Sequence, residues 1–101
     1  MRICVFCGSN TGRGEVYMEA AFELGELIAE LGFGVVYGGA RDGTMGAVAN
    51  GAMAKGGEAI GVLPRQLFEL EQAHPSLTKL HIVDSMHERK QIMHYLSDAF
   101  I

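Results

Sequence analysis

Apolar and polar residues follow two alternating patterns along this chain, and the alternation predicts strands and helices in turn. Short apolar runs rich in β-branched residues predict strands, whereas apolar residues that recur every three or four positions predict amphipathic helices. The runs that predict strands are residues 2–7, 33–37, 58–63, 79–83 and 99–101. The stretches that predict helices are residues 15–31, 45–53, a short turn at 65–70, and 86–97.

This order of elements predicts an α/β fold, a Rossmann-like three-layer doubly wound parallel sheet with helices on both faces. Right-handed crossovers leave few topologies. We expect the third strand at one edge, followed by the second, the first and the fourth, with the switch point between the first and the fourth. Because the chain stops inside an apolar run, we also expect residues 1–101 to be the N-terminal portion of a single nucleotide-binding domain, truncated within its fifth strand.

The charge and hydropathy of the chain narrow the possible partners. The formal net charge is −4, whereas binding to nucleic acid or to an anionic membrane needs clustered Lys and Arg. The apolar run at the N-terminus ends at Gly8, too early for a signal peptide, and no run reaches the ~18 apolar residues of a membrane span. We therefore expect a cytoplasmic protein that binds neither nucleic acid nor membrane.

Cys4 and Cys7 form a Cys-x-x-Cys pair inside the first predicted strand. Residues three apart in a strand point to opposite faces, and the sequence has no second cysteine pair to complete a zinc site. We interpret both cysteines as buried structural thiols.

A glycine-rich segment, residues 38–46, joins the second strand to the second helix. Glycines let the backbone approach a ligand closely, and free N–H groups at a helix start attract phosphate. Gly38 and Gly43 have the spacing of the P-loop, but Thr44 stands where that loop has lysine, so triphosphate chemistry is not expected. The segment suits phosphate binding or a tight turn that needs small residues for packing.

Two further polar segments follow strands. Residues 8–12 offer hydroxyl, amide and backbone donors for a phosphate or ribose, or else a cap for the next helix. In residues 84–90, Ser85 and Glu88 form a capping box. Arg89 and Lys90 lie near the same helix start, where the macrodipole disfavours cations, so a bound phosphate or the nearby acids should compensate them.

The four histidines do not form a predicted metal site. His87 and His94 are about 10 Å apart along a helix, too far for one metal ion. His74 and His81 have no partner nearby in the sequence. We interpret all four as surface or packing residues.

Five motifs along the chain are informative when they are taken together: Cys7-Gly8-Ser9-Asn10, Val36-Tyr37-Gly38-Gly39, Gly43-Thr44-Met45-Gly46-Ala47-Val48-Ala49, Ile60-Gly61-Val62-Leu63-Pro64 and Met86-His87-Glu88-Arg89-Lys90. With these motifs the sequence resembles the LOG (lonely guy) family of cytokinin riboside 5′-monophosphate phosphoribohydrolases, also labelled lysine decarboxylase-like. Two mild departures are Ala40, where many members have a third glycine, and Thr44, where most have leucine.

The resemblance implies a hydrolase that cleaves the N-glycosidic bond of cytokinin-type or adenosine nucleoside 5′-monophosphates such as AMP. The products would be a free base and ribose 5-phosphate, with no metal or organic cofactor. It also implies a homodimer or higher homo-oligomer. Members carry Pro-Gly-Gly-x-Gly-Thr and acidic residues after the fifth strand, and this sequence lacks that motif, so we expect the 101 residues alone to be inactive.

Arg89 is the candidate catalytic residue, since arginine can hold ribose or phosphate oxygens by a forked contact. A decarboxylase that uses pyridoxal phosphate would need a Schiff-base lysine, and no lysine lies in such a context. A nucleotide-binding or carrier module without catalysis is the alternative function. The candidate substrate- and phosphate-binding residues are Gly8, Ser9, Gly38, Gly39, Gly43, Thr44, Met45, Gly46, Met86 and Lys90.

Overall fold

A computed structural model describes residues 1–5, 15–39, 43–67, 74 and 76–100. Its strands are parallel and its helices connect them, which is the α/β architecture that the sequence predicts. The strands are β1 (Arg2–Cys4), β2 (Gly34–Tyr37), β3 (Ala59–Pro64), β4 (Lys79–Val83) and β5 (Ala99–Phe100). The helices are α1 (Glu15–Glu30), α2 (Gly43–Ala54), the 3-10 helix η1 (Arg65–Leu67) and α4 (Met86–Leu96).

The sheet has the order β4-β3-β2-β1-β5, so the predicted position of the fourth strand is wrong. β4 pairs with β3, from Ile60 opposite Lys79 to Pro64 opposite Val83, and β5 takes the place beside β1. β3 is buried along its whole length, as expected of a strand with a neighbour on each side. β4 has more exposed positions, which is typical of an edge strand. The switch point therefore lies between β1 and β5.

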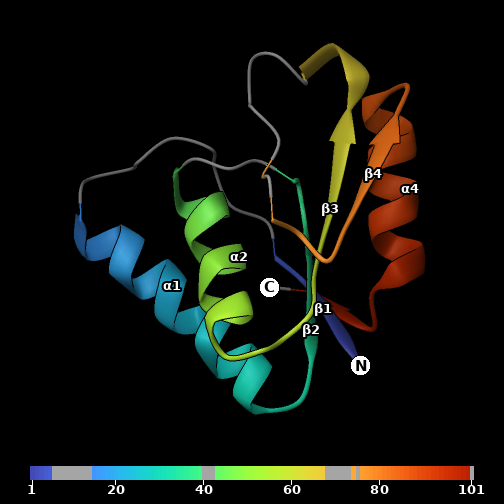
Figure 1. Ribbon diagram of the computed structural model, residues 1–101. Helices are drawn as coiled ribbons and strands as arrows, with labels where there is room; N and C mark the ends of the chain where they lie inside the picture. The colour runs from blue at the N-terminus through green and yellow to red at the C-terminus, as the bar shows by residue number, and fades with distance from the viewer. Residues whose placement is uncertain (6–14, 40–42, 68–73, 75, 101) are drawn as a thin grey trace.

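Helices cover both faces of the sheet and make the three predicted layers. α1 and α2 lie on one face and α4 on the other (Figure 1). On the first face, side chains such as Ile28 and Val48 pack against Val35 and Tyr37 of β2. On the second face, Met93 of α4 packs with alternate residues of the strands, among them Val36. Each central strand thus contributes to two cores.

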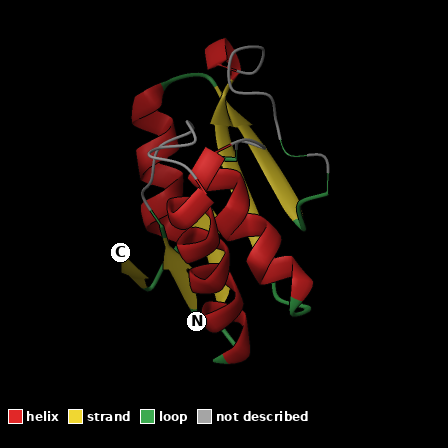
Figure 2. Ribbon diagram, turned by 90° about the vertical axis from the view of Figure 1, so that its left-hand side faces the viewer, coloured by secondary structure: helices red, strands yellow, loops and turns green. Residues whose placement is uncertain are grey.

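α1 and α2 approach each other very closely where two glycines meet the facing backbone. A Cβ on Gly25 would collide with the carbonyl oxygen of Val48, and a Cβ on Gly51 would collide with that of Phe22. Figure 2 looks onto this side and shows the two helices crossing in front of the sheet. The glycines are therefore required for the packing of the first layer.

The element boundaries differ from the predicted ones by a few residues. β3 includes Pro64, which ends the strand and so removes a donor only at its last position. η1 is described to Leu67, and the rest of the predicted turn lies outside the described residues, as do Cys7 and residues 8–12. None of the helices in the described ranges is long and apolar enough to cross a lipid bilayer.

Candidate functional site

The carboxyl ends of β1, β2 and β3 meet the first turns of α2 and α4 around a small cavity. Its volume is ≈ 160 Å³. Ligands of doubly wound sheets bind at this edge of the strands, near the switch point. The residues that line the cavity are Val5, Gly38, Met45, Met86, Arg89, Lys90 and Met93.

Arg89 is the buried cation of this cavity, with 8% of its surface exposed. Its Nε donates to the carbonyl oxygen of Val62 at 2.9 Å, and its Nη2 donates to that of Gly38 at 2.6 Å. The side chain thus reaches from α4 to the ends of β2 and β3. A buried guanidinium needs such acceptors, because removing it from water without them would cost several kcal/mol.

Gly38 leaves the space that Arg89 occupies. A Cβ at this position would collide with Arg89 Nη2 and lie 2.8 Å from Met45 Sδ. Gly39 has φ +87°, a left-handed conformation that favours glycine. The two glycines are therefore explained by the turn and by the close approach of the arginine, whether or not a ligand binds.

The first turn of α4 is capped as the sequence predicts. Ser85 is the N-cap residue, and its Oγ accepts from the backbone N–H of Glu88 at 3.1 Å. Met86 is half exposed at the rim of the cavity, with its Sδ 3.8 Å from Arg89 Nη1. Lys90 is exposed at the same rim. Arg89 lies one turn after this cap and points into the sheet, where it contacts Val62.

The structure brings five of the eleven candidate residues together around one cavity: Gly38, Met45, Met86, Arg89 and Lys90. Gly39 follows Gly38 in the same turn. Gly43, Thr44 and Gly46 belong to the first turn of α2, and Gly46 is buried. Gly8 and Ser9 lie outside the described residues. The functional roles assigned to all of these residues stay predictions.

The cavity combines two sources of positive potential with an apolar wall. Arg89 and Lys90 bring full charges, and α2 starts beside the cavity with no acidic residue in its first turn. The N-terminus of a helix carries partial positive charge from its unpaired N–H groups. Val5 and three methionines form the rest of the lining. This chemistry suits a ligand with an anionic group and an apolar part.

His74 is a buried polar residue whose contacts the sequence does not reveal. It has 7% of its surface exposed, and its Nε2 lies 2.6 Å from Asn50 Oδ1. Its backbone N–H donates to the carbonyl oxygen of Gly39 at 3.1 Å. It is therefore a packing residue, as predicted, but one that contacts the glycine turn of the site.

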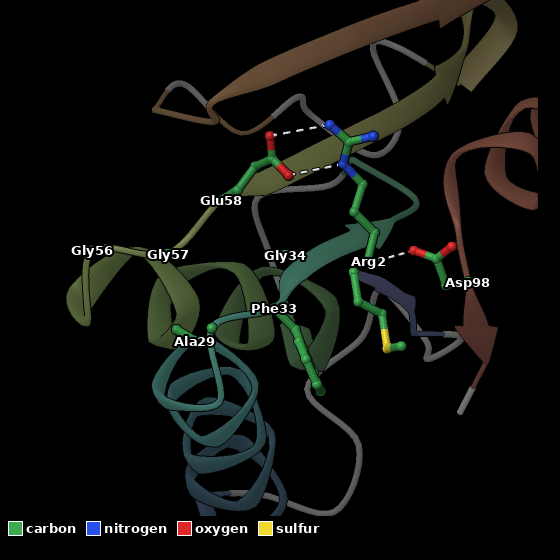
Figure 3. A pocket seen from close by; sticks show the side chains of 10 residues that line it. Arg2, Ala29, Phe33, Gly34, Gly56, Gly57, Glu58 and Asp98 are labelled. Carbon is green, nitrogen blue, oxygen red and sulfur yellow. Dashed lines mark hydrogen bonds and ion pairs between the residues drawn. The ribbon is translucent and has the colours of Figure 1, made fainter.

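A larger cavity, of ≈ 410 Å³, lies at the opposite edge of the sheet, around the amino ends of β1 and β2 (Figure 3). Arg2 crosses it to Glu58, with Nε 2.9 Å from Oε1. The Arg2 hydrogen bond lowers the pKa of Glu58, and the same bond raises the pKa of Arg2. Because the charges here satisfy each other and the switch point is elsewhere, we do not assign the catalytic site to this cavity.

Cys4 and Lys55 are further residues with possible chemistry that the structure describes. Cys4 is a buried free thiol, and burial raises its pKa, which disfavours the reactive thiolate. In the part of the chain that the structure describes, no three His, Cys, Asp or Glu residues are grouped so that they could hold a metal ion. Lys55 at the end of α2 lies 3.4 Å from Glu30 and 3.8 Å from Glu26.

The fold and the cavity define a Rossmann-like α/β protein with a buried arginine at the carboxyl edge of its sheet. The chain belongs to the LOG, or lysine decarboxylase-like, family: residues 45–101 match the family described as "Possible lysine decarboxylase". The cytokinin riboside 5′-monophosphate phosphoribohydrolase of Rhodococcoides fascians is 47% identical over 100 residues, covering 98% of this chain and 50% of that protein. The enzyme LOG of Oryza sativa is 43% identical, covering 99% and 41%.

Solved structures show the same fold. The molybdenum cofactor carrier protein of Chlamydomonas reinhardtii superposes with a TM-score of 0.81 at 26% identity, covering 98% of this chain and 59% of that one. By the sequence comparisons given above, the chain spans about half the length of the curated relatives it matches.

Proposed function

We propose that the intact protein hydrolyses the N-glycosidic bond of nucleoside 5′-monophosphates, of the cytokinin or adenosine type, to a free base and ribose 5-phosphate. The observation that carries the proposal is the buried guanidinium of Arg89, fixed by the carbonyls of Gly38 and Val62 at the wall of the cavity. The names of the relatives support this substrate class.

The reaction passes through an oxocarbenium-like transition state, in which the sugar ring becomes positive as the base departs. A carboxylate would stabilise that charge and orient water. Arg89 would hold ribose or phosphate oxygens, because its bonds to two carbonyls already fix the plane of the guanidinium, so little reorganisation is needed. The first turn of α2 would bind the phosphate through its N–H groups.

We further propose that the 101 residues alone do not hydrolyse the substrate. The carboxylate that the family resemblance implies belongs to a motif that this sequence does not contain. The remaining groups can bind and orient a substrate but cannot stabilise the cationic sugar. Release of base by the purified 101-residue chain would contradict this.

The test of the hydrolase uses the intact protein and Arg89→Lys, with AMP and N6-prenyl-AMP as substrates and chromatography of the released base. Lysine keeps the charge but cannot reproduce the bonds to both Val62 and Gly38, so we expect kcat/KM to fall about 100- to 1,000-fold. Arg65→Lys is the matched control, since Arg65 is exposed and faces only Asp84 at 3.4 Å among the contacts described. Undiminished release by Arg89→Lys would overturn the role of Arg89.

A carrier that binds a nucleotide-like ligand without cleaving it is the second candidate. The likeness to the molybdenum cofactor carrier protein favours it, since that protein has the same fold with 98% of this chain aligned. Calorimetric binding of AMP by the intact protein, with the ligand recovered unchanged after prolonged incubation, would support the carrier and refute the hydrolase.

We also propose that the protein is cytoplasmic and forms a homodimer or larger homo-oligomer. The support for self-association is apolar surface on α1, where Val16 and Leu27 are 76% and 52% exposed. Exposed apolar side chains that gather on one surface commonly mark protein interfaces. The net charge of −4 supports a protein that binds neither nucleic acid nor an anionic membrane.

A further inference from the structure

His74 joins three segments that are distant in the sequence. Its ring contacts Asn50 of α2 and the backbone of Ser76 before β4, and its own N–H binds the carbonyl of Gly39 after β2. His74 is buried, whereas Asn50 and Ser76 are exposed, so the ring bonds are partly buried. The ring nitrogens themselves have little access to water, so these bonds are costly to leave unmade.

The hydrogen bonds fix the tautomer of the ring. The backbone N–H of Ser76 donates to Nδ1 at 3.1 Å, so Nδ1 carries no proton. The proton must then be on Nε2, which donates to Asn50 Oδ1 at 2.6 Å. A neutral ring with one donor and one acceptor is what these two neighbours require.

The anchored ring holds the main chain of residue 74 against the glycine turn of the site. The N–H of His74 binds Gly39 O, and the adjacent carbonyl, that of Gly38, accepts from Arg89 Nη2 at 2.6 Å. Gly39 has φ +87°, and a Cβ at this position would lie within 3.3 Å of Leu63 and Leu80, so there is little space beside the turn on that side. A continuous series of bonds therefore runs from Asn50 through His74 and the turn to Arg89.

We propose that His74 is a positioning residue, which in its neutral Nε2–H tautomer holds the Gly38–Gly39 turn in the conformation that fixes Arg89. The identity of the ligand that Arg89 binds depends on the function proposed above. The structural link between His74 and Arg89 does not depend on it. The substitution His74→Ala would leave Asn50 Oδ1 and the Ser76 N–H without their ring partners, and the turn would lose its support.

The first test is spectroscopic and independent of activity. In the intact protein labelled with ¹⁵N, we expect His74 to show the Nε2–H tautomer, and the Nε–H signal of Arg89 to shift or broaden in His74→Ala. His94→Gln is the control, because His94 is exposed and contacts Phe100, away from the cavity. A doubly protonated or Nδ1–H ring in the wild type, or an Arg89 signal unchanged in His74→Ala, would overturn the proposal.

The second test measures rescue by variants that each restore one ring bond. The variant His74→Gln can donate to Asn50 Oδ1. The variant His74→Asn can accept from the backbone N–H of Ser76. For base release from AMP we expect His74→Ala to lower kcat/KM about 100-fold, mostly through kcat, and His74→Gln to recover about tenfold. Equal activities in His74→Ala and wild type would refute the positioning role. If the wild type releases no base, the hydrolase fails, and the Arg89 signal alone decides the role of His74.

Discussion

At the scale of single residues, the site depends on how a guanidinium is kept inside a small sheet. Arg89 has 8% of its surface exposed, and the main-chain carbonyls of Val62 and Gly38 accept from its Nε and Nη2. These carbonyls belong to β3 and to the residue that follows β2, so the backbone of the sheet fixes the direction of the side chain.

The ion pair at the opposite edge leads to a prediction on pH. Arg2 lowers the pKa of Glu58, so the folded protein has a lower pKa for this carboxyl than the unfolded chain, where it is about 4.3. The pair therefore stabilises the fold above that pH, and the contribution is lost as the pH falls through the folded pKa. Its side chains are 40% and 39% exposed, so we expect at most about 1 kcal/mol.

Urea unfolding of the wild type and Glu58→Gln at pH 7 and pH 3 checks this. The difference in the free energy of unfolding should be present at pH 7 and smaller at pH 3, because Glu58 becomes increasingly protonated as the pH falls below its unfolded pKa. Glu23→Gln, on the exposed side of α1, should show little difference at either pH. A loss in Glu58→Gln that persists unchanged at pH 3 would show that the pair does not act through the charge of Glu58.

The sequence indicates Arg89 but not His74, because Arg89 is marked by residues close to it in the sequence whereas the contacts of His74 are distant in the sequence. A cation in the first turn of a helix opposes the macrodipole, so Arg89 is conspicuous within a few residues of Ser85. His74 finds its partner 24 positions away, at Asn50, and its immediate neighbours show no periodicity. Its burial arises from three segments that meet only in the folded chain.

At the scale of elements, the first layer depends on how closely α1 and α2 approach. Gly25 of α1 meets the backbone of Val48, and Gly51 of α2 meets that of Phe22, so each helix presents a glycine to the other's backbone. Part of the apolar arc of α1 faces away from the core: Leu27 is 52% exposed, although its helical spacing indicates a buried residue.

Replacement of Gly25 by alanine tests this packing. Alanine favours a helix by about 1 kcal/mol over glycine, but its Cβ would meet the Val48 carbonyl and lie 2.8 Å from Ala52 N, which are backbone atoms that cannot rotate away. We expect a net loss of about 1–3 kcal/mol in the free energy of unfolding by urea. Ala20→Gly, on the exposed side of α1, should cost about 1 kcal/mol by propensity alone. A Gly25→Ala variant more stable than the wild type would refute the close contact.

The sequence predicts each element of the fold but not the position of β4. Periodicity is a local signal, and it identifies the strands and helices within a few residues. The sheet order depends on which strand each crossover reaches, and the rule of right-handedness does not decide whether β4 continues beyond β3 or returns to β1. The continuous apolar run of β3 is the available indication, since a strand buried along its whole length belongs inside a sheet.

At the scale of the whole molecule, the two edges and the two faces of the sheet have different properties. The carboxyl edge holds the cationic cavity, and the amino edge holds an ion pair. One face carries α1, whose outer side is apolar in part, and the other carries α4. Association through the outer side of α1 would leave the cavity at the carboxyl edge open, so binding of a ligand and self-association would not compete.

Substitution of two exposed leucines, one in the last turn of α1 and one directly after it, tests the proposed homo-oligomer. Leu27 and Leu31 are 52% and 58% exposed and lie four residues apart. The aliphatic part of a lysine side chain can replace the contacts of such an exposed leucine. By light scattering at micromolar concentration we expect the wild type to be a dimer or larger, and Leu27→Lys/Leu31→Lys to be a monomer of nearly unchanged stability, within about 0.5 kcal/mol. Gln91→Lys on α4, an exposed polar position, controls for the added charge and should leave the assembly intact. A monomeric wild type would refute the oligomer, whereas an unchanged assembly in the double variant would place its interface elsewhere than α1.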